Sequence, residues 1–183
     1  MPRILAFDTA TSFGAVCGVG ERRARAARAG DLLKAVDELV ENPRDVEAIV
    51  VGRGPGSFTS IRIGLAVARS LALTLGVPVA GATTLHGYEV ALAVVDARRG
   101  EVFTPGPRVC RPEELDVTGR TLVGDGAVRY RALFEAAGAT VPPDDDDAHL
   151  PDPRLLVAHA GPFGAAELVE PLYVREPDAR PVA

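Results

Sequence analysis

Residues 52–65 read Gly52-Arg53-Gly54-Pro55-Gly56-Ser57-Phe58-Thr59-Ser60-Ile61-Arg62-Ile63-Gly64-Leu65, a glycine-rich turn between two apolar segments. The preceding Ala48-Ile49-Val50-Val51 has the composition of a buried strand, and Ser57 stands where an N-cap begins a helix that runs to Leu75. Because Pro55 has a fixed φ and its glycine neighbours reach positive φ, the backbone can reverse sharply here. The stretch predicts a strand–turn–helix unit whose structural turn is Gly54, Pro55, Gly56 and Ser57.

Such a turn can also bind an anion, because unpaired amides and the helix dipole point toward the same spot. It does not match a P-loop, since no Gly-Lys-Ser/Thr follows it. It does not match a dinucleotide fingerprint either, since it does not open a βαβ unit at the start of the chain. A plain strand-to-helix connection is the favoured interpretation, and an anion site is the alternative.

The elements predicted around this turn follow the order β-β-β-α-β-α-β. In the first part of the chain, strands are expected at 3–7, 14–19, 22–28, 48–51 and 77–80, and helices after Asp31 and at 57–75. This is the order of the ribonuclease-H-like lobe of actin, sugar kinases and Hsp70 chaperones. The second part is less regular, with strands expected at 88–95, 101–103 and 121–123 and helices at about 128–137 and 153–160. We therefore predict an α/β protein with two ribonuclease-H-like (actin-like ATPase) lobes, residues 1–81 and a reduced second lobe at 82–183.

Composition excludes several classes of protein. The chain has 183 residues, 47% of them apolar, which is typical of a folded globular protein. Its net charge is −5 and its aromatic residues are few, so neither a strongly basic face nor a stacking platform for RNA is expected. The two cysteines lack metal spacing, and no signal peptide or membrane-spanning run is recognised. We expect a cytoplasmic protein that has no contact with membranes.

The residues that could carry chemistry favour structural roles. Asp8 follows the first strand, where ATPases of this fold place an aspartate before a phosphate-binding turn, but Gly14 is the first glycine after it. Gly124-Asp125-Gly126 is the nearest candidate for a second phosphate turn. The three histidines, His86, His149 and His159, show no helical i,i+4 pair. We therefore expect no catalytic residue, no bound cofactor and no metal.

Four stretches carry a resemblance to a known family. The run Gly54-Pro55-Gly56-Ser57-Phe58-Thr59, with Ile61-Arg62-Ile63-Gly64, closely resembles the signature of the TsaB (YeaZ) family of bacterial tRNA-modification proteins, which belongs to the actin-like/Hsp70-like ATPase superfamily. Three further stretches agree with this family in order and spacing: Ile4–Thr11, Asp96–Phe103 and Pro171–Arg175. The resemblance covers nearly the whole chain.

The resemblance implies a function in making N6-threonylcarbamoyladenosine, next to the anticodon of tRNAs that read ANN codons. A TsaB-like protein is the non-catalytic subunit, which stabilises and activates the catalytic subunit TsaD. The ATPase TsaE is the third partner, the protein alone forms a homodimer, and tRNA is met only through the complex. Catalytic relatives carry a paired-histidine metal motif where this chain has Thr83–Tyr88 with His86 alone. Two alternatives remain at this point, an actin-like ATPase or sugar-kinase-type enzyme and a metallopeptidase-like protein.

The helix predicted over 57–75 has apolar residues on two sides, so it is either internal or an interface. Gly64 costs stability within a helix and is best tolerated where another chain segment comes close. Because TsaB-like proteins pair through helices of this lobe, we expect a partner interface at seven residues: Leu32, Leu33, Val36, Phe58, Ile61, Leu65 and Ala68.

The chain also departs from the family pattern. Pro105-Gly106-Pro107 follows closely after Phe103, where relatives continue a β-hairpin. This departure predicts a compact second lobe that lacks strands.

Overall fold

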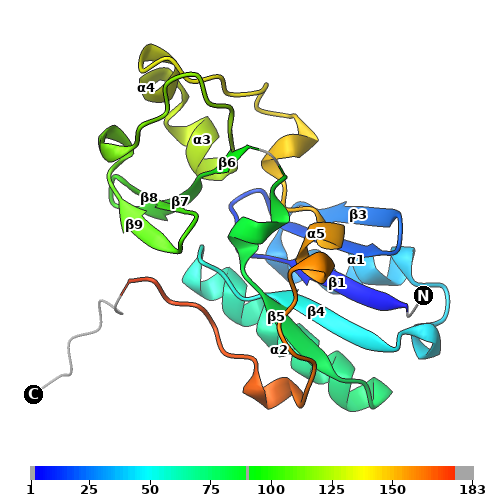
Figure 1. Cartoon of the computed structure of the whole chain (residues 1–183). Coiled ribbons are helices and arrows are strands. Elements are labelled where there is room, and N and C mark those ends of the chain that lie inside the picture. The colour runs from blue at the N-terminus through cyan, green and yellow to red at the C-terminus, as the bar shows by residue number, and fades with distance from the viewer. Residues whose placement is uncertain (1–2, 90, 176–183) are drawn as a thin grey trace, which may run out of the picture.

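Five strands of the first half of the chain form one sheet in the computed structural model, which describes residues 3–89 and 91–175 (Figure 1). They are β1 (Ile4–Asp8), β2 (Ala15–Val19), β3 (Arg22–Ala26), β4 (Ala48–Gly52) and β5 (Val79–Ala82). The spatial order is β3-β2-β1-β4-β5, with β1, β2 and β3 antiparallel and β1, β4 and β5 parallel. This is the ribonuclease-H-like arrangement, so the predicted fold class is confirmed.

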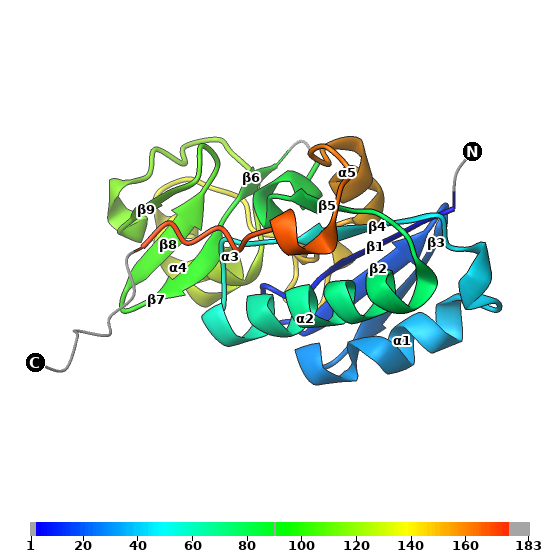
Figure 2. The same cartoon turned by 90° about the horizontal axis from the view of Figure 1, so that it is seen from below.

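Helices cover both faces of this sheet. Helices α1 (Leu32–Leu39) and α2 (Phe58–Leu75) lie side by side on one face, and α5 (Pro153–Ala158) packs on the other (Figure 2). The α1/α2 side holds the larger core, which includes Phe7, Ile49 and Val51. Leu156 of α5 packs on the opposite side of the same strands, against Ala6 and Val50. Alternate residues of β1 and β4 therefore enter two different cores, as the two-residue period of a strand requires.

Helix α2 begins and ends as the sequence predicts. The Ser57 hydroxyl accepts the Ser60 N–H at 3.4 Å, and Gly76 ends the helix in the left-handed conformation with φ +70°. By length and composition α2 could also cross a membrane. In this fold it lies along the sheet, and its inner residues Ile61, Leu65 and Ala68 are buried in the core. Packing within the protein therefore explains the apolar residues on the inner side of α2.

The second lobe is smaller. It contains β6 (Leu92–Ala93), β7 (Val95–Arg98), β8 (Glu101–Thr104), β9 (Arg108–Cys110) and β10 (Leu122–Val123), followed by α3 (Asp125–Arg129) and α4 (Arg131–Ala136). Strands β7, β8 and β9 form an antiparallel sheet, and β10 pairs with β6 in parallel. Short 3-10 helices connect the elements of both lobes: η1 (Ala29–Asp31), η2 (Pro43–Asp45), η3 (Thr84–Gly87), η4 (Pro112–Glu114), η5 (Asp147–His149) and η6 (Ala166–Leu168).

Several expectations for this lobe need correction. The strand predicted over 88–95 is replaced by β6 and the start of β7, because β6 pairs with β10 whereas β7 pairs with β8. Residue 90 lies outside the described part. The helix predicted over 128–137 is two helices that meet at Tyr130. The hairpin after Phe103 is present, because Gly106 takes φ +80° and lets Arg108 pair with Thr104.

The segment after α5 continues along the first lobe. Its Gly161 N–H donates to the Gly81 carbonyl at 3.0 Å, and Gly164 forms a bridge with Val79 at the edge of β5. Farther on, the Leu172 N–H donates to the Arg53 carbonyl at 2.7 Å, and Arg175 pairs with Glu101 of the second lobe. This C-terminal strap, residues 161–175, therefore runs from α5 along the first lobe and ends against the second. It joins the two lobes in addition to η3 and to the segment that leads from α4 into α5.

Candidate partner-binding face and interlobe cleft

The glycine turn is held by hydrogen bonds to neighbouring backbone. The Ser57 N–H donates to the Ala10 carbonyl at 2.7 Å, and the Gly54 carbonyl accepts the Thr84 N–H at 2.9 Å. Gly54 has φ +103°, a conformation that favours glycine. A Cβ on Gly56 would lie 2.4 Å from the Ala10 carbonyl oxygen. These contacts support the structural interpretation of the turn, since its Ser57 amide already has a partner within the chain.

Asp8 is buried at the end of β1, and its carboxylate bonds to neighbouring protein groups. Its Oδ1 accepts the Ala10 N–H at 2.7 Å, and its Oδ2 accepts the Thr84 hydroxyl at 2.6 Å. Burial raises the pKa of this carboxyl, the two hydrogen bonds oppose that rise, and nearby Asp125 adds to it. Asp8 thus joins the first strand to η3, as a structural residue does.

Asp125, in the predicted second phosphate turn, closes the gap between the lobes. Its Oδ2 accepts the Ser12 N–H at 2.7 Å, and its Oδ1 accepts the Asp96 N–H at 2.9 Å. Burial raises the pKa of its carboxyl, and the bonds from Ser12 and Asp96 partly offset this. The aspartate that could have faced a phosphate instead binds the loop after β1.

His149 positions this turn. The histidine is buried, its Nδ1 lies 3.1 Å from the Gly124 N–H, and its Nε2 lies 3.1 Å from the Pro142 carbonyl oxygen. Because the Gly124 amide can only donate, Nδ1 is the acceptor and Nε2 carries the proton. The imidazole is therefore neutral and fixes the backbone immediately before Asp125.

Tyr88 brings a third oxygen to the same region. Its hydroxyl is buried and has no hydrogen-bond partner among the described residues. Burial, and then the nearby Asp125 and Asp8, raise its pKa well above the ordinary value for a tyrosine. The hydroxyl therefore stays protonated, next to two desolvated carboxyl groups. Nothing in the sequence pattern singled out Tyr88 or His149, because their partners are distant in the chain.

An apolar groove of about 520 Å³ lies between α1 and the C-terminal half of α2. Its side chains are mainly aliphatic, and Lys34 and Asp37 of α1 lie among them. Four of its aliphatic residues are in the helices, one is in β1, and two lie in the connections on either side of η2: Leu33, Val36, Leu71 and Leu75; Leu5; Val40 and Val46. An open aliphatic groove between two helices is a surface that another helix can cover.

The structure separates the seven residues predicted for a partner interface into two groups. Five are buried in the protein's own core: Leu32, Val36, Ile61, Leu65 and Ala68. Leu33 is 52% exposed and borders the groove. Phe58 is 46% exposed, but its ring stacks on that of Tyr173, with the ring centroids 5.1 Å apart. The Arg62 guanidinium carbon also lies over the Phe58 ring, 4.4 Å from its centroid. Leu33 is therefore the predicted residue best placed for a partner.

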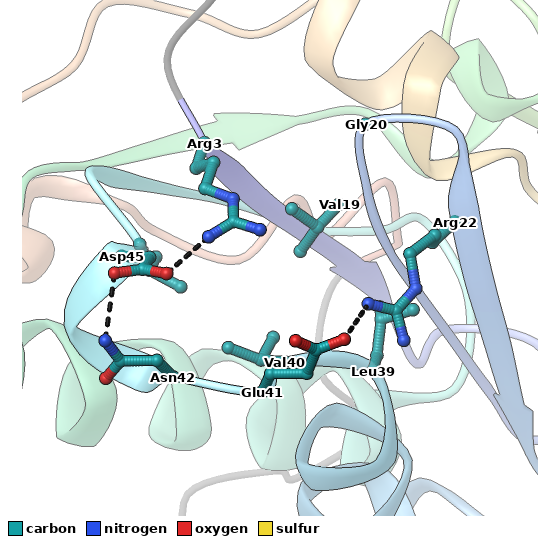
Figure 3. A pocket seen from close by; sticks show the side chains of 10 residues that line it. Arg3, Val19, Gly20, Arg22, Leu39, Val40, Glu41, Asn42 and Asp45 are labelled. Carbon is teal, nitrogen blue, oxygen red and sulfur yellow. Dashed lines mark hydrogen bonds and ion pairs between the residues drawn. The ribbon is translucent and has the colours of Figure 1, made fainter.

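Two other cavities contain charges that are already paired. The hollow at the N-terminal end of β1 has a volume of about 190 Å³, and in it Arg22 pairs with Glu41 and Arg3 with Asp45 (Figure 3). A cavity of about 570 Å³ lies between the start of α2, the β7–β8 hairpin and the strap. In this second cavity Arg98 pairs with the buried Asp96 at 3.3 Å. Neither cavity presents an arrangement of reactive groups.

Comparison with known proteins identifies the family of this chain. The sequence model of the family described as "TsaD: tRNA N6-adenosine threonylcarbamoyltransferase" matches residues 10–128. The matched part includes the glycine turn, α2, Asp96 and Asp125. The chain belongs to this family, within its TsaB (YeaZ) branch.

Individual relatives extend the match over the whole chain. A Mycobacterium tuberculosis protein of unassigned function is 35% identical over 209 residues, which cover 98% of this chain and 95% of that protein. The Escherichia coli tRNA threonylcarbamoyladenosine biosynthesis protein TsaB is 34% identical over 122 residues, or 55% of this chain and 53% of that protein. A Pseudomonas aeruginosa crystal structure, described as similar to peptidase YEAZ, has a TM-score of 0.73 at 26% identity and covers 96% of this chain and 100% of its own.

Proposed function

We propose that this chain is the non-catalytic subunit of the machinery that makes N6-threonylcarbamoyladenosine in ANN-decoding tRNAs. In this reaction TsaD transfers the threonylcarbamoyl group from threonylcarbamoyl-adenylate to the N6 nitrogen of the adenosine, and AMP leaves. The proposed role of this chain is to bind TsaD and stabilise its active form in the cytoplasm. TsaE would be the third partner, and tRNA would be reached only through the complex.

The observation that carries this proposal is the state of the interlobe cleft in a member of the TsaB branch. The carboxylate oxygens of Asp8 and Asp125 all accept hydrogen bonds from N–H or O–H groups of the protein itself. In the segment Thr83–Tyr88, where the catalytic relatives carry paired histidines, this chain has the single histidine His86. Within residues 3–89 and 91–175, no group of three or more His, Cys, Asp or Glu side chains could hold a metal ion. These features support an accessory role over the ATPase and metallopeptidase alternatives.

The groove between α1 and α2 is the proposed binding face for TsaD. It is aliphatic, it is open, and Leu33 stands exposed at its edge. A stable interface of standard size buries about 800 Å² on each partner, so the proposed interface extends beyond the groove over the neighbouring surface of α1 and α2. If the same face also forms the homodimer, the two assemblies exclude each other, and added TsaD should dissolve the homodimer.

The test is co-purification with TsaD of the same organism, followed by reconstitution of threonylcarbamoylation with TsaD, TsaE and tRNA. Leu33→Asp should weaken TsaD binding and lower the modification rate. Leu168→Asp is the matched control, because Leu168 is 79% exposed on the strap, away from α1. If the Leu33→Asp variant binds TsaD as the wild type does, the interface with TsaD lies on another surface. Failure of the wild-type chain to support TsaD at all would overturn the proposed function.

A further inference from the structure

Two histidines that are distant in the sequence come together on the surface. His86 lies in η3, and His159 follows the last residue of α5. Their ring centroids are 5.0 Å apart and the ring planes are inclined by 48°. Both side chains are exposed, so an ion from solvent can reach them. Although the sequence alone led us to expect no metal, we propose that His86 and His159 form a binding site for a borderline divalent metal ion, Zn²⁺ in particular, that bridges η3 and α5.

The spacing of the two rings suits one shared ion. A Zn–N(His) bond is about 2.0–2.1 Å long, so two imidazoles on one tetrahedral ion have their ring centroids roughly 5 Å apart. Imidazole pairs favour Zn²⁺, Ni²⁺ and Cu²⁺ over Mg²⁺ and Ca²⁺, which prefer oxygen ligands. Among the described residues no third His, Cys, Asp or Glu joins the pair. The site therefore has two protein ligands, and water completes the coordination.

The backbone on both sides of the pair is well fixed. The Asp152 N–H donates to the Gly87 carbonyl at 2.6 Å, which ties the start of α5 to η3 (Figure 1). Gly87 also packs so closely on Pro151 that a Cβ would lie 2.6 Å from the Pro151 Cβ. Leu85 and Leu156 are buried on the inner side of the two elements. Because both elements are anchored, little ordering of the backbone is needed for an ion to bind.

The surroundings of His86 favour its neutral form. Partial burial, and then the proximity of His159, lower the pKa of His86. Neutral imidazole is the form that binds metal, so His86 is available as a ligand at neutral pH. This pair is separate from the interlobe cluster of Asp8, Asp125 and Tyr88, and it does not depend on the proposed binding of TsaD.

Calorimetric titration of the tag-free full chain with ZnCl₂ at neutral pH tests the site. We expect one Zn²⁺ per chain. Since even outer-shell partners of a metal ligand are worth about 10- to 100-fold in affinity, His86→Gln and His159→Gln should each weaken binding by at least about tenfold. Asp145→Asn is the control, because Asp145 lies in the exposed acidic run 144–147, a rival site for cations. The Asp145→Asn variant should bind Zn²⁺ with the affinity of the wild type.

Thermal melts give a second readout that does not depend on the heat of binding. An ion that binds only the folded chain raises the melting temperature, so Zn²⁺ should raise that of the wild type and not that of the doubly substituted chain. Circular dichroism without metal should show that both histidine variants fold. The proposal is overturned if the wild type binds no Zn²⁺, or if either folded histidine variant binds with wild-type affinity.

Discussion

The Asp125 carboxylate accepts the Ser12 N–H at 2.7 Å, although these residues are 113 positions apart and lie in different lobes. Its other oxygen accepts the Asp96 N–H at 2.9 Å, within its own lobe. One carboxylate therefore joins the loop after β1 to the start of α3, across the cleft where other proteins of this fold place the phosphates of a nucleotide. At this position the chain holds its two lobes together with its own hydrogen bonds.

Replacing this carboxylate should destabilise the protein. Asp125→Ala leaves the Ser12 and Asp96 amides without their acceptor. The bond from the Asp96 amide is buried, so its loss costs about 1–3 kcal/mol, and the loss of the part-buried bond from Ser12 costs less. We expect a loss of about 1–4 kcal/mol in the free energy of unfolding, measured by urea denaturation. Asp125→Asn keeps one acceptor oxygen and should fall between the alanine variant and the wild type. An alanine variant as stable as the wild type would mean that the bond to Ser12 does not hold the lobes together.

Burial of Asp8 should give stability a particular pH dependence. Desolvation raises the pKa of Asp8 in the folded state above its value of 3.8 in the unfolded chain. The native state then retains the proton more strongly, so this contribution to stability is fully present below pH 3.8 and is lost as pH rises through the folded pKa. Asp8→Asn removes this titration while keeping a polar side chain of the same shape.

The measurement is the free energy of unfolding of both chains between pH 4 and 8. We expect the stability of the wild type to fall relative to Asp8→Asn as pH rises. Asp125, whose pKa is also raised, is present in both chains, so its own titration largely cancels in the difference. Parallel stability curves would show that Asp8 titrates alike in the folded and unfolded states.

The glycine turn should tolerate no side chain at Gly56. A Cβ there meets the Ala10 carbonyl oxygen at 2.4 Å, and this oxygen is fixed because it accepts the Ser57 N–H. We expect Gly56→Val to cost about 1–3 kcal/mol through local strain, and thermal melts measure this loss. Gly54→Val should also destabilise, since Gly54 has φ +103°. Gly30→Ala is the control, because a Cβ on Gly30 meets no atom within 4 Å.

The sequence predicts those features that depend on residues close together in the chain, and it does not predict those that depend on contacts between distant segments. The turn at 54–57 and the start of α2 depend on neighbouring residues, so Gly54, Pro55 and Ser57 were sufficient to predict them. The pairs Ser12–Asp125 and His86–His159 join distant segments and have no local spacing that would reveal them. The orientation of α2 was equally hidden, because both of its apolar stripes fit a buried face and only the packed sheet determines which one turns inward.

The last prediction uses that orientation. Leu65 is 4% exposed and packs in the main core, whereas Leu73, two turns farther along α2, is 86% exposed. Leu65→Asp places a carboxylate without a partner among aliphatic side chains, and we expect a loss of about 4 kcal/mol or more. Leu73→Asp makes the same change in the same helix, yet it should melt like the wild type, because its side chain stays in water. Circular dichroism melts distinguish the two.

The consequence concerns how interface experiments on this helix are interpreted. If the Leu65→Asp variant fails to bind TsaD, we expect the reason to be that it is unfolded. Its circular dichroism spectrum would then lack the helical signal of the wild type. Leu33→Asp, at the edge of the groove, is the substitution that can remove binding while the fold persists, since Leu33 already lies half in solvent. If Leu65→Asp folds normally and still loses the partner, then α2 presents its Leu65 side outward and the orientation described above is wrong.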